Sequence, residues 1–326
     1  MRKAITLWVI SLMWAVQCHA AGFQSVELPN EAGTAIKLAI WYPSAAPTAV
    51  RDMGVFTQEV ATNGEIRGKK LPLVIISHGT GGNAFSHYDT ALELANAGFV
   101  VAALTHPGDN SQDQSRATDI LERPKHVVAV INYMLGDWEK HAALAPDRIG
   151  MFGFSSGGFT AVVNVGGKPD LTLVFEYCKT HAADFVCGLV SSHKEQPRPI
   201  AKVVPKQLYD ARIKAAVIAA PALGFTFDAA SLRDVRLPIQ LWRAEDDVLL
   251  PHPWYAEAVR KSLPMEPEYH VVPGAGHFDF LAPCSEKLAR IVPPICASQD
   301  GFDRASFHRR FNAEVVAFFE KVLAEK

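Results

Sequence analysis

The chain alternates continuous apolar runs with segments whose apolar residues recur at helical spacing. Runs of the first kind are typical of strands that are buried on both faces of a parallel sheet. Strands are predicted at residues 35–42, 71–77, 99–104, 148–154, 213–219, 238–242 and 268–272. Strands that alternate with helices favour an α/β fold, with a mostly parallel central sheet and helices on both of its faces.

Two of the helical segments stand out by their apolar stripes. The first carries Val127, Val128, Ile131, Met134 and Leu135, and Gly136 can end it. The second closes the chain with Phe311, Val315, Phe318, Phe319 and Val322. Residues 44–70 are polar and contain glycine and proline, so they are expected to form a loop.

Residues 165–212 break the alternation, because they separate the helix after residue 155 from the next strand. Connections in α/β units usually span about 2–6 residues. This one contains aromatic residues and a pair of cysteines, which argues against disorder. We expect a cap or lid insertion beside the functional site, within a single domain that spans residues 21–326.

The first 20 residues are predicted to be a signal peptide. Arg2 and Lys3 precede a short apolar run that ends at small residues, with cleavage expected after Ala20 or Ala21. The apolar run is shorter than the roughly 20 residues that span a bilayer. Gln17 in front of Cys18 argues against lipidation of that cysteine. The protein is therefore expected to be periplasmic or secreted, with no transmembrane segment after signal removal.

Charge and cysteine content narrow the picture further. The leader carries two basic and no acidic residues, so the mature chain has a net charge near −4, which favours no nucleic-acid partner. Four cysteines remain after cleavage, and export favours their oxidation. Proximity in sequence predicts the disulfides Cys178–Cys187 and Cys284–Cys296, although four cysteines allow three pairings and buried free thiols are the alternative. Their spacing fits no metal site.

The strongest motif is Gly153-Phe154-Ser155-Ser156-Gly157, which fits G-x-S-x-G. It directly follows the strand predicted at 148–154 and precedes a helical segment, which is the context that gives this motif meaning. Ser155 would occupy the apex of a sharp turn as a nucleophile. Ser156 is the rival, but it lies one position past the apex.

A serine hydroxyl needs a base, and the base needs an acid to fix its tautomer. His277 follows Gly274-Ala275-Gly276 after the last strand, where this architecture holds its base; His270 and His252 are weaker candidates. Asp247 follows the strand at 238–242 and is preferred over the adjacent Asp246. The chain order Ser155, Asp247, His277 is the order expected of this arrangement.

The loop His78-Gly79-Thr80-Gly81-Gly82 follows the strand at 71–77. The backbone N–H of Thr80, together with that of Ser156, is predicted to form an oxyanion hole, with His78 bracing the loop. Residues 79–84 also fit the dinucleotide pattern G-x-G-x-x-A. However, residues 103–106 at the end of the next strand offer no acid for a ribose, and export separates the protein from nicotinamide cofactors.

These motifs resemble the predicted dienelactone hydrolases of bacteria and the platelet-activating-factor acetylhydrolases, both of the α/β-hydrolase superfamily. The resemblance is carried by AIWYPS (39–44), LVIISHGTGG (73–82), FVVAALTHPGDN (99–110), DRIGMFGFSSGGFTA (147–161), AEDDVLLP (244–251) and GAGHFDFLAP (274–283). Dienelactone hydrolases use a cysteine nucleophile where this chain has serine, which favours a general carboxylesterase. The acetylhydrolase resemblance implies small acyl groups on a lipid-like alcohol.

The expected function is serine-dependent hydrolysis of a small-molecule or lipid-like carboxylic ester through an acyl-enzyme, with no cofactor and no metal. Two alternatives remain: a binding protein of the same fold that has lost its chemistry, and a peptidase or acyltransferase that uses the same three residues. The sequence does not predict the acyl and alcohol specificity or the oligomeric state.

Overall fold

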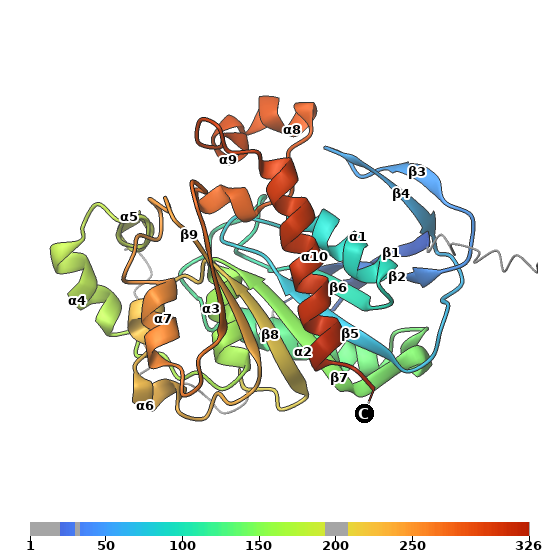
Figure 1. Cartoon of the computed structure of the whole chain (residues 1–326), viewed down its shortest axis with the longest axis horizontal. Helices are drawn as coiled ribbons and strands as arrows, with labels where there is room; N and C mark the ends of the chain where they lie inside the picture. The colour runs from blue at the N-terminus through green and yellow to red at the C-terminus, as the bar shows by residue number, and fades with distance from the viewer. Residues whose placement is uncertain (1–19, 30–32, 193–207, 326) are drawn as a thin grey trace, which may run out of the picture.

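The computed structural model describes residues 20–29, 33–192 and 208–325 (Figure 1). The predicted signal peptide lies outside these residues except for Ala20, which begins the first strand. Among the described residues, no helix is both long and apolar enough to cross a membrane.

The described strands form one ten-stranded sheet in the order β10-β9-β8-β7-β5-β6-β2-β1-β4-β3. Its central part, from β10 to β6, is parallel, and β2 pairs antiparallel with both β6 and β1. The strands are β1 (Ala20–Leu28), β2 (Ile36–Ser44), β3 (Ala49–Asp52), β4 (Thr57–Thr62), β5 (Leu71–Ser77), β6 (Val100–Thr105), β7 (Leu144–Phe154), β8 (Ile213–Ala219), β9 (Ile239–Ala244) and β10 (Glu268–Val272). The predicted mostly parallel sheet is thus observed.

The expectation of a loop over residues 44–70 is wrong, because β3 and β4 lie within it. Most of β3 is exposed, and β4 alternates exposed with buried side chains. Such polar strands at the edge of a sheet lack the continuous apolar run that identifies a central strand. The same reason explains β1, which the sequence pattern did not predict and whose second half also alternates between exposed and partly buried residues.

Helices cover both faces of the sheet (Figure 1). One face packs against α1 (Tyr88–Asn96) and α10 (Arg304–Val322), through residues such as Leu94, Phe311 and Phe319. The other face packs against α2 (Glu122–Gly136), α3 (Ser156–Asn164) and α7 (Ala256–Ser262), through residues such as Val127 and Phe159. The alternation of side chains along each strand supplies both cores.

Short helical elements complete the described part of the chain. They are η1 (His141–Ala143), α4 (Leu173–Thr180), α5 (Phe185–Ser192), η3 (Gly224–Thr226), α6 (Ala229–Leu232), η4 (His277–Phe280), α8 (Glu286–Ile291) and α9 (Pro293–Cys296). The structure joins Cys284 to Cys296, which ties the segment before α8 to the end of α9.

The predicted insertion at 165–212 contains α4 and α5, joined by the disulfide Cys178–Cys187. Its residues 193–207 lie outside the described part of the chain. Tyr177 of α4 is buried and stacks on Phe225 of η3, with ring centroids 4.0 Å apart. Tyr177 also meets Tyr255, the residue before α7, edge to face. Aromatic packing therefore anchors α4 beside η3 and α7, while its role as a cap remains a prediction.

Candidate active site

Ser155 occupies a sharp turn between β7 and α3. Its backbone has φ 55° and ψ −118°, a conformation that L-residues rarely adopt. A Cβ on Gly157 would lie 1.9 Å from the carbonyl oxygen of Ser77, and one on Gly153 would lie 2.1 Å from the carbonyl oxygen of Gly157. The two glycines of the motif are therefore demanded by contact between backbones, and these contacts fix the turn that presents the serine.

The structure brings Ser155, His277 and Asp247 into one hydrogen-bonded chain. Nε2 of His277 lies 3.0 Å from Oγ of Ser155, and Nδ1 lies 2.7 Å from Oδ2 of Asp247. Since the carboxylate can only accept, the neutral imidazole carries its proton on Nδ1 and offers the Nε2 lone pair to the serine hydroxyl. These residues come from the segments that follow β7, β9 and β10, at the carboxyl edge of the sheet.

The packing around these residues holds them in this arrangement. Oδ1 of Asp247 accepts hydrogen bonds from the backbone N–H groups of Leu249 and Leu250, at 3.0 and 2.7 Å. The Phe154 ring lies against the imidazole of His277, with centroids 4.8 Å apart. Ser155, Asp247 and His277 are all buried, so water competes little for their hydrogen bonds.

The weaker candidates lie elsewhere. Asp246 is exposed next to the buried Asp247. His270 stacks on Trp242 and faces the carboxylates of Glu268 and Glu314. His252 is exposed in the turn before α7.

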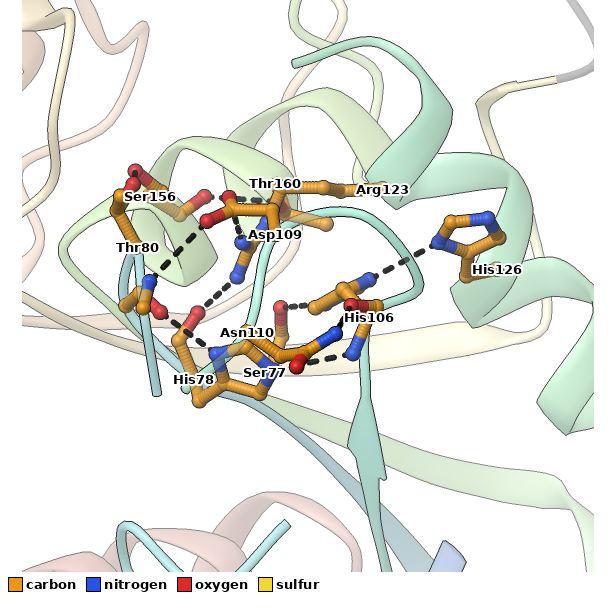
Figure 2. A network of polar contacts seen from close by, with 12 residues as sticks. Ser77, His78, Thr80, His106, Asp109, Asn110, Arg123, His126, Ser156 and Thr160 are labelled. Carbon is orange, nitrogen blue, oxygen red and sulfur yellow. Dashed lines mark hydrogen bonds and ion pairs between the residues drawn. The ribbon is translucent and has the colours of Figure 1, made fainter. Parts of the chain in front are cut away.

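The remaining rival, Ser156, lies at the start of α3. Its hydroxyl is 2.6 Å from that of Thr80, and either group can be the donor. Figure 2 shows these two side chains pointing toward one another.

The loop after β5 lies against Ser155, as the predicted oxyanion hole requires. A Cβ on Gly79 would be 3.1 Å from Cβ of Ser155. Ser156 is the first residue of α3, and N–H groups in the first turn of a helix have no acceptor within that helix. Backbone donors from Thr80 and Ser156 are thus carried by two segments that meet beside Ser155.

His78 holds this loop from within. The backbone N–H of His106 donates to its Nε2 at 3.1 Å, so Nδ1 carries the proton and donates to the carbonyl of Gly79 at 2.6 Å. Burial, together with the nearby charge of Arg123, lowers the pKa of His78 well below its usual range. The side chain is therefore neutral and structural, in agreement with the bracing role that the sequence suggested.

Sequence reasoning missed two charged residues beside this loop, Asp109 and Arg123. Both are buried and form an ion pair (Figure 2). The sequence held a signal for Arg123, because it lies four residues before Val127 and seven before Val130, on the buried face of α2.

Among the described residues, no group of histidine, cysteine and acidic side chains is arranged to hold a metal ion.

Comparison with solved structures identifies the fold. The ferulic acid esterase from Streptomyces cinnamoneus superposes with a TM-score of 0.63, covering 94% of this chain and 91% of that one at 18% sequence identity. The chain therefore has the α/β-hydrolase fold. The arrangement of sheet and helices agrees with the fold class that the sequence predicted.

Sequence comparisons point to the same superfamily. The family model of platelet-activating factor acetylhydrolase, isoform II, matches residues 37–134 of the chain. A probable 2-oxo-3-(5-oxofuran-2-ylidene)propanoate lactonase from Bradyrhizobium sp. is 32% identical over 124 residues, which cover 32% of this chain and 48% of the lactonase. The chain thus spans about half the length of the curated relative that it matches.

Proposed function

We propose that this α/β-hydrolase is a serine-dependent carboxylic ester hydrolase that works through an acyl-enzyme. The observation that carries the proposal is the hydrogen-bonded chain from Ser155 through His277 to Asp247. An alcohol is a poor nucleophile at neutral pH unless a base takes its proton as it attacks. His277 is placed to do so, and Asp247 keeps the lone pair of Nε2 directed at the hydroxyl.

The proposed reaction has two steps that use the same groups. Oγ of Ser155 attacks the ester carbonyl carbon while His277 takes the hydroxyl proton, and the tetrahedral intermediate collapses when His277 returns that proton to the leaving alcohol. Water then attacks the acyl-enzyme and gives a proton to His277, which returns it to Oγ of Ser155 as the acid leaves. Asp247 stabilises the imidazolium in both steps.

The negative oxygen of each tetrahedral intermediate needs donors that are in place before the reaction. The N–H groups of Thr80 and Ser156 are proposed for this role. Loss of one such donor typically costs about 3–4 kcal/mol of transition-state stabilisation. Their position in two packed segments, rather than on mobile side chains, suits a preorganised site.

The names of the similar proteins support the substrate class and leave the substrate open. An acetylhydrolase, a lactonase and a ferulic acid esterase each carry a name that refers to cleavage of a carboxylic ester or lactone. We therefore propose a small-molecule or lipid-like ester as substrate. The dienelactone hydrolases, which the chain resembles, use a cysteine nucleophile. The serine at position 155 therefore favours general esters over dienelactones as substrates.

The test combines covalent labelling with a substrate panel. A fluorophosphonate is expected to modify Ser155 of the native protein, as located by mass spectrometry, and to leave the Ser155→Ala variant unlabelled. p-Nitrophenyl esters of rising acyl length are expected to be hydrolysed, and an aminoacyl-anilide much more slowly. Absence of label on Ser155 would favour the binding-protein alternative, and faster cleavage of the anilide would favour a peptidase.

A further inference from the structure

Two buried charges next to the proposed active site have no part in the mechanism described so far. We propose that Asp109 and Arg123 form a positioning pair, which holds the loop His78–Gly82 so that the Thr80 N–H meets the reaction's oxyanion. This inference rests on the proposed function. Neither side chain would touch the substrate; both would act through the backbone of the loop.

Three segments meet at this pair (Figure 2). The loop follows β5, Asp109 lies in the turn after β6, and Arg123 lies in the first turn of α2. One guanidinium nitrogen of Arg123 donates to Oδ2 of Asp109, and the other donates to the carbonyl oxygen of His78. Oδ1 of Asp109 accepts from the backbone N–H of Gly81 at 3.1 Å.

The contacts bracket Thr80 in the chain. Arg123 donates to the carbonyl of His78, two residues before Thr80. Asp109 accepts from the N–H of Gly81, one residue after Thr80. Because the two side chains are also bound to one another, they close a loop of polar contacts around the peptide that carries the proposed oxyanion donor. The hydroxyl contact of Thr80 with Ser156 fixes the remaining side against the second donor.

Stability alone is a poor explanation for such a pair. Asp109 and Arg123 are each 2% exposed. The cost of removing two charges from water generally offsets their attraction, so replacing a buried ion pair by apolar residues is often neutral or stabilising. A pair of this kind that is bound to both sides of one functional peptide is better explained by the geometry it imposes.

The imidazoles beside the pair of Asp109 and Arg123 stay neutral. His78 and His106 lie beside Arg123, and burial together with that positive charge lowers the pKa of both imidazoles well below the usual range. Their rings are therefore neutral near pH 7. Nδ1 of His78 donates to Gly79, inside the same loop. Among the described residues named in these contacts, the full charges are those of Asp109 and Arg123, which balance.

The test compares two double variants that leave no charge unpaired. Asp109→Leu with Arg123→Met removes both contacts to the loop, whereas Asp109→Asn with Arg123→Met keeps an oxygen for the Gly81 N–H. We expect kcat of the leucine variant on a p-nitrophenyl ester to fall about 10²- to 10³-fold, as for a lost oxyanion donor. KM should change less than about threefold, and the asparagine variant should recover at least part of kcat.

A second readout follows the oxyanion directly. A trifluoromethyl ketone forms a tetrahedral adduct with the serine, and its affinity should fall across the variants by the same factor as kcat/KM. Urea unfolding of each variant gives its stability separately. The remote pair Asp210–Arg212 supplies a matched control, since Asp210→Asn with Arg212→Met should change stability and leave kcat and ketone affinity unchanged.

Arg123→Lys serves where a double variant does not fold, because it keeps the positive charge but loses the forked contact to His78 and Asp109. It is expected to lower kcat at near-constant KM. Wild-type kcat in the folded leucine double variant, or in Arg123→Lys where that variant does not fold, overturns the positioning role, while the esterase proposal stands. A wild-type protein with neither ester turnover nor a label on Ser155 overturns the esterase proposal instead.

Discussion

At the scale of single residues, the site depends on a strained serine held by close backbone contacts. The positive φ of Ser155 is unfavourable for an L-residue, and it persists because the surrounding chain leaves no alternative. Its N–H donates to the carbonyl of Ala219, and its own carbonyl accepts from Phe159 and Ala222. The strain is thus offset by hydrogen bonds to the neighbouring strand and helix.

Gly157→Ala is expected to destabilise the protein strongly, by about 3 kcal/mol or more, because the added Cβ would collide with backbone atoms of β5. Gly136→Ala at the end of α2 is the control. Nothing lies within 4 Å of the added Cβ there, so its effect should stay below about 1 kcal/mol. Urea unfolding measures both, and equal stabilities would show that the backbone contact at Gly157 is unimportant.

Asp247→Asn is expected to reduce kcat by about 10⁴-fold, the size of effect seen when a catalytic histidine loses the carboxylate that fixes its tautomer. The neighbouring Asp246→Asn is a matched control, since that side chain is exposed, and it should keep kcat within about threefold of the wild type. Steady-state kinetics on a p-nitrophenyl ester distinguish them. A larger loss at Asp246 would transfer the acid role to that residue.

At the scale of elements, the two disulfides fasten short helices that have little core of their own. Cys178–Cys187 joins α4 to α5 across 9 residues, and Cys284–Cys296 closes a span of 12 residues around α8 and α9. In α8 and α9 no residue is buried, and α5 buries only Val186 and Cys187. Elements with so few buried contacts depend on cross-links and neighbouring segments for order.

Removal of the α4–α5 cross-link by Cys178→Ser with Cys187→Ser is expected to lower stability by up to about 3 kcal/mol, from loop-closure entropy. If this insertion is a cap, the same variant should also shift KM across the ester panel. Cys284→Ser with Cys296→Ser closes a similar span and should lower stability with a different or absent shift in acyl preference. Thermal melting and kinetics that are unchanged in both variants would show that the cross-links are dispensable.

At the scale of the whole molecule, several histidines are buried in the neutral form. Burial, opposed in part by the nearby Asp89 carboxylate, lowers the pKa of His87 to about 3. Burial and the charge of Arg123 lower the pKa of His126 to about 4. The unfolded chain would protonate these residues near pH 6.5, so the folded state loses stability as the pH falls below that value.

Each of these two histidines should therefore make the free energy of unfolding about 2 kcal/mol lower at pH 5 than at pH 7.5. His87→Leu is expected to reduce the difference in unfolding free energy between these pH values by about that amount. The ring lies edge-on against Phe152 and Phe154, which an apolar side chain can also contact. Urea midpoints at the two pH values check this, and an unchanged difference would rule out His87 as a source of acid sensitivity.

Strong local patterns in the sequence predicted the central architecture. The central strands β5 to β9 contain continuous apolar runs, whereas β10 at the sheet edge is mostly exposed or half-buried. Phe311, Val315 and Phe319 of α10 are buried at the predicted helical spacing. The residues at the carboxyl ends of β7, β9 and β10 could be named because a parallel sheet brings those ends to one edge. The polar edge strands β3 and β4 were not predicted, because exposure on the sheet edge removes the apolar pattern that identifies a strand.

The sequence by itself therefore determined the order of the elements and the chemical groups available at the sheet edge, since both follow from local spacing and turn chemistry. The sequence favoured Asp247 over Asp246, and the tertiary structure shows Asp247 against His277. Only the tertiary structure brought Asp109 and Arg123 to the loop around Thr80. The reason is physical: these contacts join residues far apart in the chain. Their geometry depends on how β5, β6 and α2 pack together.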